Sequence, residues 1–369
     1  MRPYLLVAAV IIGATTALVG CSTLQRAVEI QSDLDGLTRS GVVGSIATLD
    51  DGTTTAVMTS GVPNRTNGDS IGKNDRVRIG SVTKTFTASL VLQLVAEGKV
   101  DLDAPIERYL PGLLHSSDMD GSGIDGSAIT VRQLLQHRSG LPEFAGEPGA
   151  DEWIAANENR TLTPSAAVAI ALGKPAQFVP GTSFVYTNTN YIVLGMLVES
   201  VSGRSYADEL RSRILDPLDL EDTYLPPAGE LDIRGDHLTG YQDLDGGLTD
   251  VSRTEPSIPW AAGAMVSTGT DLNTFWRALL DGQVVPAEQL AEMTTPQVAA
   301  TEAEGLEYGM GVGATELPCG VTYTGHSGGI YGYYTLSGAT PDRAFTVTLT
   351  STPKDQPDTV AILSHALCP

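Results

Sequence analysis

The stretch that decides the fold reads Ser81-Val82-Thr83-Lys84, and it stands between a strand-like run and a helix-like run. Val77 to Ile79 predicts a short strand, and apolar residues then recur at helical spacing as far as the turn signal at Gly98. A helix opening at Ser81 places Ser81 and Lys84 on one face and directs its positive N-terminal potential at the serine oxygen. The pattern favours a nucleophilic serine beside a lysine that accepts its proton once burial lowers the lysine pKa. The ordinary alternative is a helix-capping serine followed by a surface lysine.

Two more short motifs supply complementary groups. Tyr186-Thr187-Asn188 offers a phenol that can relay a proton and an amide that can hold both a lysine and a substrate carbonyl. His326-Ser327-Gly328-Gly329 precedes an aromatic strand that begins at Tyr331, and its glycines permit close approach of a substrate to the backbone. Taken singly, the first could be a polar turn with a core tyrosine and the second a structural histidine.

The rest of the chain predicts strands at both ends and helices between them. Hairpins are indicated by two pairs of strand-like segments, 42–49 with 54–62 and 331–337 with 345–351, and helices are indicated over 165–172, 191–202 and 357–367. Because tight turns join consecutive strands, the sheet is predicted to be antiparallel. We expect an α+β fold: one hydrolase domain over residues 41–369, with an antiparallel sheet flanked by helices and an all-α lobe over roughly 99–255.

The N-terminus has the features of an export signal. Arg2 precedes an apolar run that ends in Leu18-Val19-Gly20-Cys21, which looks like a bacterial lipobox. We expect residues 1–20 to be a lipoprotein signal peptide, Cys21 to carry the lipid, and 21–40 to form a polar, partly helical tether. A retained membrane helix is the alternative, although the run is short for a bilayer core of ~30 Å.

Lipidation of Cys21 would leave two cysteines, Cys319 and Cys368. An oxidising compartment favours a disulfide between them, and two separate free thiols are the alternative.

The chain has 22 basic and 44 acidic residues, which gives a net charge of −22, so a nucleic-acid partner is not expected. The 41% apolar content is that of a globular protein. Asp118 to Gly123 resembles the start of a calcium loop but lacks a glutamate at its twelfth place, which is Ile129. We expect neither a metal nor a cofactor.

The three motifs in this order resemble those of the serine β-lactamase and penicillin-binding family, in its class C β-lactamase and D-alanyl-D-alanine carboxypeptidase branch. The resemblance covers about residues 40–369, and it includes three supporting stretches: 134–142, Pro180-Gly181, and 262–268. It implies the fold described above, with the active site between the sheet and the helical lobe.

The resemblance also implies a role for each matching residue. Ser81 would be the acylated nucleophile, Lys84 and Tyr186 would share proton transfer with the base left open, and Asn188 would orient Lys84 and the substrate. The remaining groups would bind the substrate: an oxyanion hole from the N–H groups of Ser81 and Gly329, a strand edge at His326, Ser327 and Gly328 for a terminal carboxylate, and a pocket wall at Trp260.

The carboxypeptidase branch is favoured by two features, His326 in place of the lysine usual in β-lactamases and the cysteine seven residues before it, paired with one near the C-terminus. The arginine that this branch places shortly before that cysteine is missing, because no arginine or lysine occurs between Arg277 and Arg343. An unperturbed His326 would titrate near ~6.5.

These features predict an exported, lipid-anchored, monomeric serine hydrolase, carboxypeptidase-like and penicillin-binding. It would act on a small peptide, β-lactam or ester, and cell-wall peptide is a possible substrate. A class C-type β-lactamase or esterase is the first alternative, and a catalytically idle sensor or binding protein is the second. The intact Ser81, Lys84, Tyr186 and Asn188 argue against the idle protein.

Overall fold

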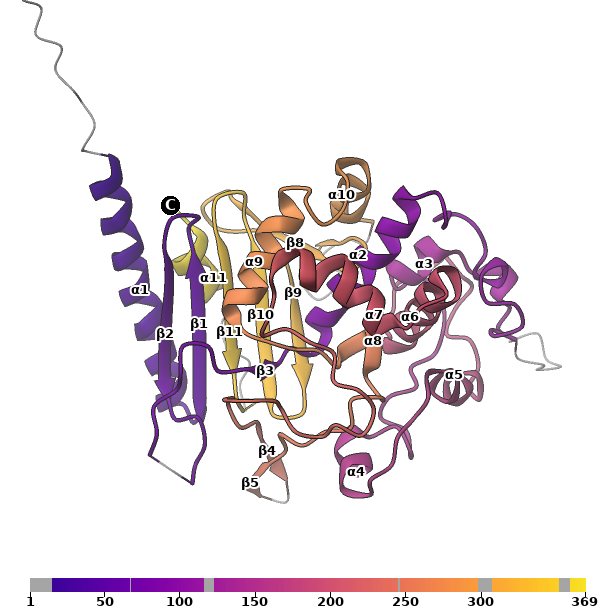
Figure 1. Ribbon diagram of the computed structural model, residues 1–369, viewed down its shortest axis with the longest axis horizontal. Helices are drawn as coiled ribbons and strands as arrows, with labels where there is room; N and C mark the ends of the chain where they lie inside the picture. The colour runs from indigo at the N-terminus through magenta and orange to yellow at the C-terminus, as the bar shows by residue number, and fades with distance from the viewer. Residues whose placement is uncertain (1–14, 67, 116–122, 245, 298–306, 352–358) are drawn as a thin grey trace, which may run out of the picture.

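A seven-stranded antiparallel sheet forms the centre of the computed structural model, which describes residues 15–66, 68–115, 123–244, 246–297, 307–351 and 359–369 (Figure 1). Its strand order is β2-β1-β11-β10-β9-β8-β7. The strands are β1 (Gly44–Asp50), β2 (Thr55–Gly61), β7 (Glu307–Tyr308), β8 (Gly313–Glu316), β9 (Thr322–Ile330), β10 (Tyr333–Ala339) and β11 (Ala344–Leu349). Two small pairs lie outside it: β3 (Val77–Arg78) with β6 (Val266–Ser267), and β4 (Tyr241–Leu244) with β5 (Gly247–Asp250).

Helices cover the sheet and build a separate lobe beside it. They are α1 (Thr15–Arg39), α2 (Thr83–Ala96), α3 (Val131–Leu135), α4 (Glu152–Asn157), α5 (Pro164–Leu172), α6 (Asn188–Ser202), α7 (Tyr206–Leu210), α8 (Trp260–Gly263), α9 (Gly269–Leu280), α10 (Ala287–Thr294) and α11 (Thr359–Leu367). Short turns of 3-10 helix also occur, of which η1 (Gly80–Val82) leads directly into α2. Figure 1 shows α3 to α7 gathered on the side of the molecule away from α1. The expected antiparallel α+β architecture is confirmed.

Alternation along the strands explains how the sheet holds two layers of helices. In β1, Ala47 and Leu49 belong to the apolar cluster under α1 and α11, whereas Ile46 belongs to the larger cluster that includes α2 and α9. Successive strand side chains point to opposite faces, so a strand buried on both faces is apolar at nearly every position. This accounts for the loose alternation of residues 42–49 in the sequence.

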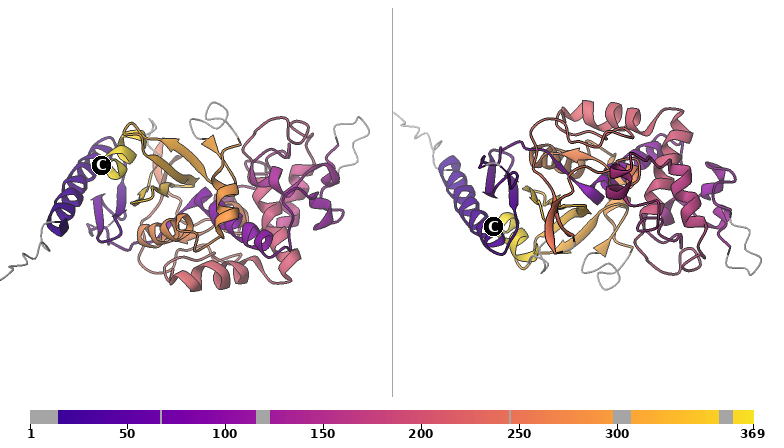
Figure 2. Two further views of the ribbon diagram at one scale, coloured as in Figure 1. Left: turned by 90° about the horizontal axis from the view of Figure 1, so that it is seen from above. Right: turned by 90° about the horizontal axis from the view of Figure 1, so that it is seen from below.

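The segment after the lipobox differs from the expected tether. It is part of the long helix α1, whose Ile30 and Leu34 are fully buried against the sheet. Further contacts hold this helix: Gln31 Nε2 donates to the Thr59 carbonyl at 3.0 Å, and His365 Nδ1 lies 2.7 Å from Asp33 Oδ2. Figure 2 shows α1 lying beside α11, so the two ends of the described chain meet on one face. The positions Ala27, Ile30, Leu34 and Leu37 recur at helical spacing, a signal for a docked helix that the prediction of a polar tether did not use.

The strands at the third motif also differ in their limits from the prediction. His326, Ser327 and Gly328 lie within β9, while Tyr331 and Gly332 form the turn before β10 rather than the start of a strand. Gly332 has φ +74°, a conformation that favours glycine, and so the turn falls there. The β4–β5 hairpin within the helical lobe region was not predicted.

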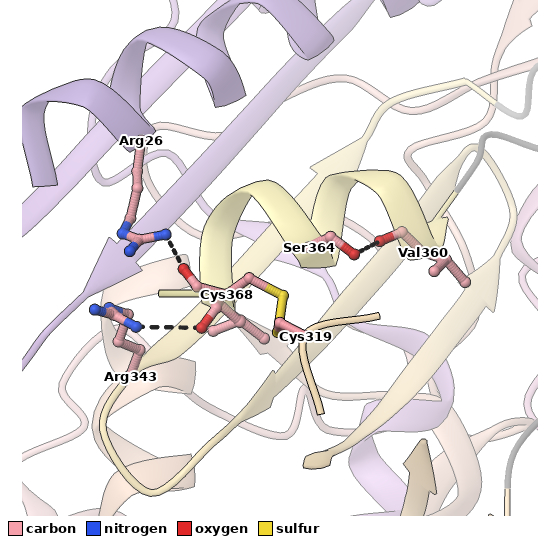
Figure 3. Close-up of a disulfide and its surroundings, with 7 residues drawn as sticks. Arg26, Cys319, Arg343, Val360, Ser364 and Cys368 are labelled. Carbon is pink, nitrogen blue, oxygen red and sulfur yellow. Dashed lines mark hydrogen bonds between the residues drawn. A yellow bond between two sulfur atoms is a disulfide. The ribbon is translucent and has the colours of Figure 1, made fainter. Parts of the chain in front are cut away.

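A disulfide between Cys319 and Cys368 joins the loop before β9 to the end of α11, as expected (Figure 3). The last carbonyls of the chain are held by two arginines from distant segments. Arg343 donates to the Leu367 carbonyl at 3.2 Å, and Arg26 of α1 donates to the Cys368 carbonyl. The disulfide therefore belongs to a junction of α1, β9 and α11.

Loss of this disulfide is expected to lower the free energy of unfolding by at most about 4 kcal/mol, the chain-entropy value for a loop of this length. The sequence separation is 49 residues. Urea denaturation of Cys319→Ser with Cys368→Ser should show the lower midpoint, whereas Ser364→Ala, a control on the same helix, should leave it nearly unchanged. Peptide mapping that finds two alkylatable thiols in the oxidised wild-type protein would refute the pairing.

Candidate active site

Ser81 and Lys84 meet at the junction between the sheet and the helical lobe. Lys84 Nζ lies 3.0 Å from Ser81 Oγ, 2.7 Å from Asn188 Oδ1 and 2.8 Å from the Ala262 carbonyl. These partners come from η1, α6 and α8, which pack around α2. Helix α2 is predominantly apolar and buried along most of its length, so it carries the Lys84 side chain into the interior.

Burial governs the protonation of Lys84. The residue is fully buried, and desolvation lowers its pKa to about 7, although the negative charge of Glu143 acts in the opposite direction. The Asn188 amide oxygen and the Ala262 carbonyl can only accept hydrogen bonds, whereas the Ser81 hydroxyl can also donate. In the neutral amine, the two N–H groups can stay with the two acceptors while the lone pair faces Ser81. This geometry therefore allows a neutral Lys84 to accept a proton from the Ser81 hydroxyl.

Glu143 fixes the orientation of Asn188. Its Oε2 accepts from the Asn188 backbone N–H at 2.7 Å and from Asn188 Nδ2 at 3.1 Å. Because Nδ2 is held by the carboxylate, the amide oxygen faces Lys84. Glu143 was not singled out in the sequence. The only signal for it is a carboxylate directly after Leu141-Pro142, at the end of a stretch that carries the resemblance.

Tyr186 lies against both catalytic candidates. Lys84 Nζ is 4.8 Å from the centre of the Tyr186 ring. Desolvation raises the pKa of the Tyr186 phenol, and a hydrogen bond with Ser81 only partly offsets this. The residue as a whole is 37% exposed, so its ring also borders solvent while the environment of the hydroxyl keeps it protonated.

His326 lies in the site but its ring nitrogens are both engaged by the protein. Nδ1 contacts the Ser327 carbonyl, and Nε2 lies 3.1 Å from the hydroxyl of Tyr308 on β7. Burial first, and then the charge of Lys84, lower the pKa of His326 to about 4. This pKa lies below the ordinary imidazole value that the sequence suggested, and both ring nitrogens have protein partners, while the expected role of His326 in binding a substrate carboxylate stays a prediction. Its ring lies beside that of Tyr186, with the ring centres 6.2 Å apart.

Glycines bring η1 close to β9. A Cβ at Gly328 would lie 2.0 Å from the Ile79 carbonyl oxygen and 3.0 Å from the Ser81 nitrogen, and a Cβ at Gly80 would lie 2.8 Å from the Gly329 carbonyl oxygen. Only glycines permit this approach, which sets the Ser81 backbone beside β9. Gly328 thus lies directly against the Ser81 backbone, and Gly329 and Ile330 line the cavity. The expected contact of Ser327 and Gly328 with a substrate stays a prediction.

A cavity of about 110 Å³ opens beside Ser81. Its lining combines polar and apolar surface and includes these residues: Ser81, Phe144, Ala145, Glu152, Tyr186, Asn188, Ile258, Pro259, Ala262, Gly263, Gly329 and Ile330. Trp260, which was expected to wall the pocket, instead packs against Tyr206 and leaves no room for a side chain at Gly195. Pro259, which precedes α8, and Ala262 and Gly263 within it line the cavity. The Trp260 side chain lies on the side of α8 that faces Tyr206.

Glu152 is an acidic residue in the cavity lining that the sequence analysis did not single out. Desolvation, together with the charges of Asp151 and Glu143, raises its pKa to about 7, against the lowering effect of its own backbone N–H and of Arg78. Arg78 is buried and donates to the carbonyls of Ser252 and Leu231. An acid at the start of α4 is an ordinary helix-capping pattern, so its place in the cavity comes only from the tertiary fold.

Nothing in the described part of the chain forms a group of three or more metal-ligating side chains. The calcium-loop stretch from Asp118 lies almost wholly outside the described residues. The helices of the described ranges include none that is long and apolar enough to cross a membrane.

Several known proteins are similar to this chain in sequence and in fold. Residues 30–366 match the family described as Beta-lactamase. Penicillin-binding protein 4* of Bacillus subtilis is 26% identical over 283 residues, which is 71% of this chain and 57% of that protein. Penicillin-binding protein 4 of Amycolatopsis lactamdurans is 31% identical over 233 residues, or 62% of this chain. The match again spans 57% of the relative's length.

Solved structures match over nearly the whole chain. A D-stereospecific amidohydrolase from Streptomyces sp. has a TM-score of 0.84 and 35% identity, with 93% of this chain and 98% of that one covered. The D-amino acid amidase of Ochrobactrum anthropi SV3 with D-phenylalanine has a TM-score of 0.77 and 27% identity, with 92% and 98% covered. An octameric penicillin-binding protein homologue from Pyrococcus abyssi has a TM-score of 0.75 and 26% identity, with 94% and 76% covered.

The match to the family spans most of the chain, and the fold and the order of the three motifs agree with it. The protein belongs to the Beta-lactamase family of serine hydrolases and penicillin-binding proteins.

Proposed function

We propose that this protein hydrolyses small amides of D-amino acids through an acyl-Ser81 intermediate. The observation that carries the proposal is the buried Lys84 amine, 3.0 Å from Ser81 Oγ with a pKa of about 7. A serine becomes a nucleophile only when a base removes its proton, and this lysine is partly neutral at the pH of a cell.

Proton transfer is divided between Lys84 and Tyr186 in this proposal. Lys84 accepts the Ser81 proton as Oγ attacks the substrate carbonyl. The protonated phenol of Tyr186 donates to the departing nitrogen and regains a proton from the Lys84 ammonium. A neutral His326 favours this assignment, because a cation in its place would lower the pKa of Tyr186 towards the phenolate.

The developing oxyanion would be held by the backbone N–H groups of Ser81 and Gly329. The glycine contacts described above set η1 against β9 and so support such a pair of donors. Donors that are fixed before the reaction stabilise charge more effectively in a water-poor site than they would in solvent.

Glu152 favours substrates that carry an ammonium group. It is an acid in the cavity beside Ser81, and a bound ammonium would lower its pKa and favour its ionised form. A free D-amino acid amide or an amino-terminal D-residue has such a group next to the reacting carbonyl. The amidases of Streptomyces sp. and Ochrobactrum anthropi are named for D-specific amide substrates, which agrees with this choice.

The carboxypeptidase and β-lactam reactions use the same acylation step. A carboxypeptidase of this branch needs a cation for the terminal carboxylate of its substrate, and His326 is neutral with both nitrogens engaged. We therefore rank that activity below amide hydrolysis. Acylation by penicillins remains the second candidate, because the relatives from Bacillus subtilis and Amycolatopsis lactamdurans are named as penicillin-binding proteins.

We also propose export and lipid attachment at Cys21, on the lipobox-like sequence. The residues after Cys21 would form a helix packed on the domain rather than a free tether, because Thr23 donates a hydrogen bond to Asp51 and Ile30 is buried. The catalytic domain would then stay close to the membrane surface.

Acylation of Ser81 should follow the titration of Lys84. With p-nitrophenyl acetate as a neutral substrate, kcat/KM is expected to rise with pH through about 7 and to level off above about 8, because the lysine must be neutral to accept a proton. Intact-mass spectrometry should show one acetyl adduct, which Ser81→Ala loses.

Lys84→Met should abolish the burst of acylation, whereas Lys99→Met, an exposed lysine paired with Glu97 just beyond the end of α2, should keep the wild-type pH profile. A flat profile between pH 5 and 9, or an adduct that survives in Ser81→Ala, would remove the basis of the proposed chemistry.

Glu152 should set the preference for a free amine. We expect the wild-type protein to hydrolyse D-alanine amide with a higher kcat/KM than N-acetyl-D-alanine amide at pH 8. Glu152→Gln should reduce that ratio about tenfold to a hundredfold, or ~1.4–2.8 kcal/mol. Glu147→Gln is the matched control. An unchanged ratio in Glu152→Gln would show that the carboxylate does not meet the substrate amine.

Lipid attachment can be tested in a bacterial host grown with radiolabelled palmitate. The full-length chain should carry label and sediment with membranes, and Cys21→Ser should lose both properties. Label that persists in Cys21→Ser, or a wild-type chain free of label, would contradict the anchor.

A further inference from the structure

His137 is a buried residue with an unusual backbone for its type. It follows α3, is fully buried, and has φ +55°, in the left-handed region that is unfavourable for a non-glycine residue. It makes no hydrogen bond with Ser81 or Lys84 in the described structure. Its contacts are instead directed to the segment that carries Tyr186.

The backbone on both sides of Tyr186 is bound by His137. Its carbonyl accepts from the Val185 N–H at 3.1 Å, and its Nδ1 accepts from the Thr187 N–H at 3.2 Å. Asn190 Nδ2 lies 3.1 Å from the same Nδ1. One residue therefore fixes the chain immediately before and immediately after the tyrosine.

The His137 ring also stacks on the Tyr186 ring. Their centres are 4.1 Å apart and their planes differ by 29°. Three other aromatic rings surround the imidazole, those of Phe184, Tyr191 and Tyr308, at 5.1 to 6.0 Å. The phenol of Tyr186 is thus confined by one face of the imidazole while Lys84 lies near its ring.

A purely structural packing role explains the imidazole poorly. Since Nδ1 accepts hydrogen bonds, the ring proton lies on Nε2, which is buried and has no hydrogen-bond partner among the described residues. An unpaired buried donor is destabilising, and an apolar ring would avoid that loss. A phenyl ring could pack here but could not accept from Thr187.

We propose that His137 is the positioning residue for Tyr186: its stacked ring and its two backbone hydrogen bonds hold the phenol where it can donate a proton to the leaving group. This inference rests on the acid role given to Tyr186 above. A displacement of about 1 Å at a proton donor can cost on the order of a hundredfold in rate.

The test uses aryl acetates whose leaving phenols have increasing pKa. A general acid matters more as the leaving group becomes more basic, so Tyr186→Phe should lose little kcat/KM with p-nitrophenyl acetate and progressively more along the series. Two variants dissect His137. His137→Asn tolerates the left-handed backbone and keeps an acceptor but removes the stacked ring, and His137→Phe keeps a ring but removes the acceptor.

Both His137 variants are expected to lose about tenfold to a hundredfold in kcat/KM at the basic end of the series and much less at p-nitrophenyl acetate. In a Tyr186→Phe background, His137→Asn should add less than about twofold, because the two residues act as one unit. Thermal unfolding reports whether each variant is folded.

A loss of equal size along the whole series, or a loss that adds fully to that of Tyr186→Phe, would overturn the proposal and leave His137 a packing residue. If Tyr186→Phe itself shows no dependence on the leaving group, the acid role of Tyr186 fails, and the proposal for His137 fails with it. The two failures are distinguished by the Tyr186→Phe series alone.

Discussion

The removal of the Lys84 amine from water is the constraint on which the site depends. A buried ammonium is costly unless its hydrogen bonds are satisfied, and here three oxygens surround it, from Ser81, Asn188 and Ala262. The same burial lowers its pKa to about 7. One physical effect thus stabilises a particular packing of α2 between sheet and lobe and also prepares a base beside the serine.

Neutral groups occupy the side of the site nearest the lysine. Burial keeps the imidazoles of His326 and His137 uncharged and the phenol of Tyr186 protonated. A cation at any of these places would oppose the Lys84 ammonium through a poorly screened region. The acidic groups lie elsewhere: Glu143 holds Asn188, and Glu152, whose pKa is raised to about 7, lies in the cavity. This distribution suits a reaction that passes a proton between neutral groups and a substrate that carries a positive one.

Close contact between backbones joins the two halves of the molecule. Gly80 and Gly328 let η1 lie directly against β9, so the N-terminal end of α2 and an inner strand of the sheet form one rigid edge. Residues more than 200 positions apart are thereby held together at the serine. The junction of α1, α11 and the disulfide supports the same sheet from its opposite face, on the side of the molecule away from α3 to α7 (Figure 1).

The sequence by itself determined the local features of this protein. The three-residue spacing of Ser81 and Lys84, the hairpins at both ends and the order of the motifs follow from periodicity and turn residues, and the two cysteines outside the lipobox could be paired by their number. Only the tertiary structure decided the rest. It assigned Glu143 to Asn188, Glu152 to the cavity, Tyr308 to His326 and His137 to Tyr186, and it moved Trp260 away from the pocket. These contacts join segments that no local pattern connects. The pKa values of Lys84, Glu152 and His326 depend on burial, which arises only when those segments pack together.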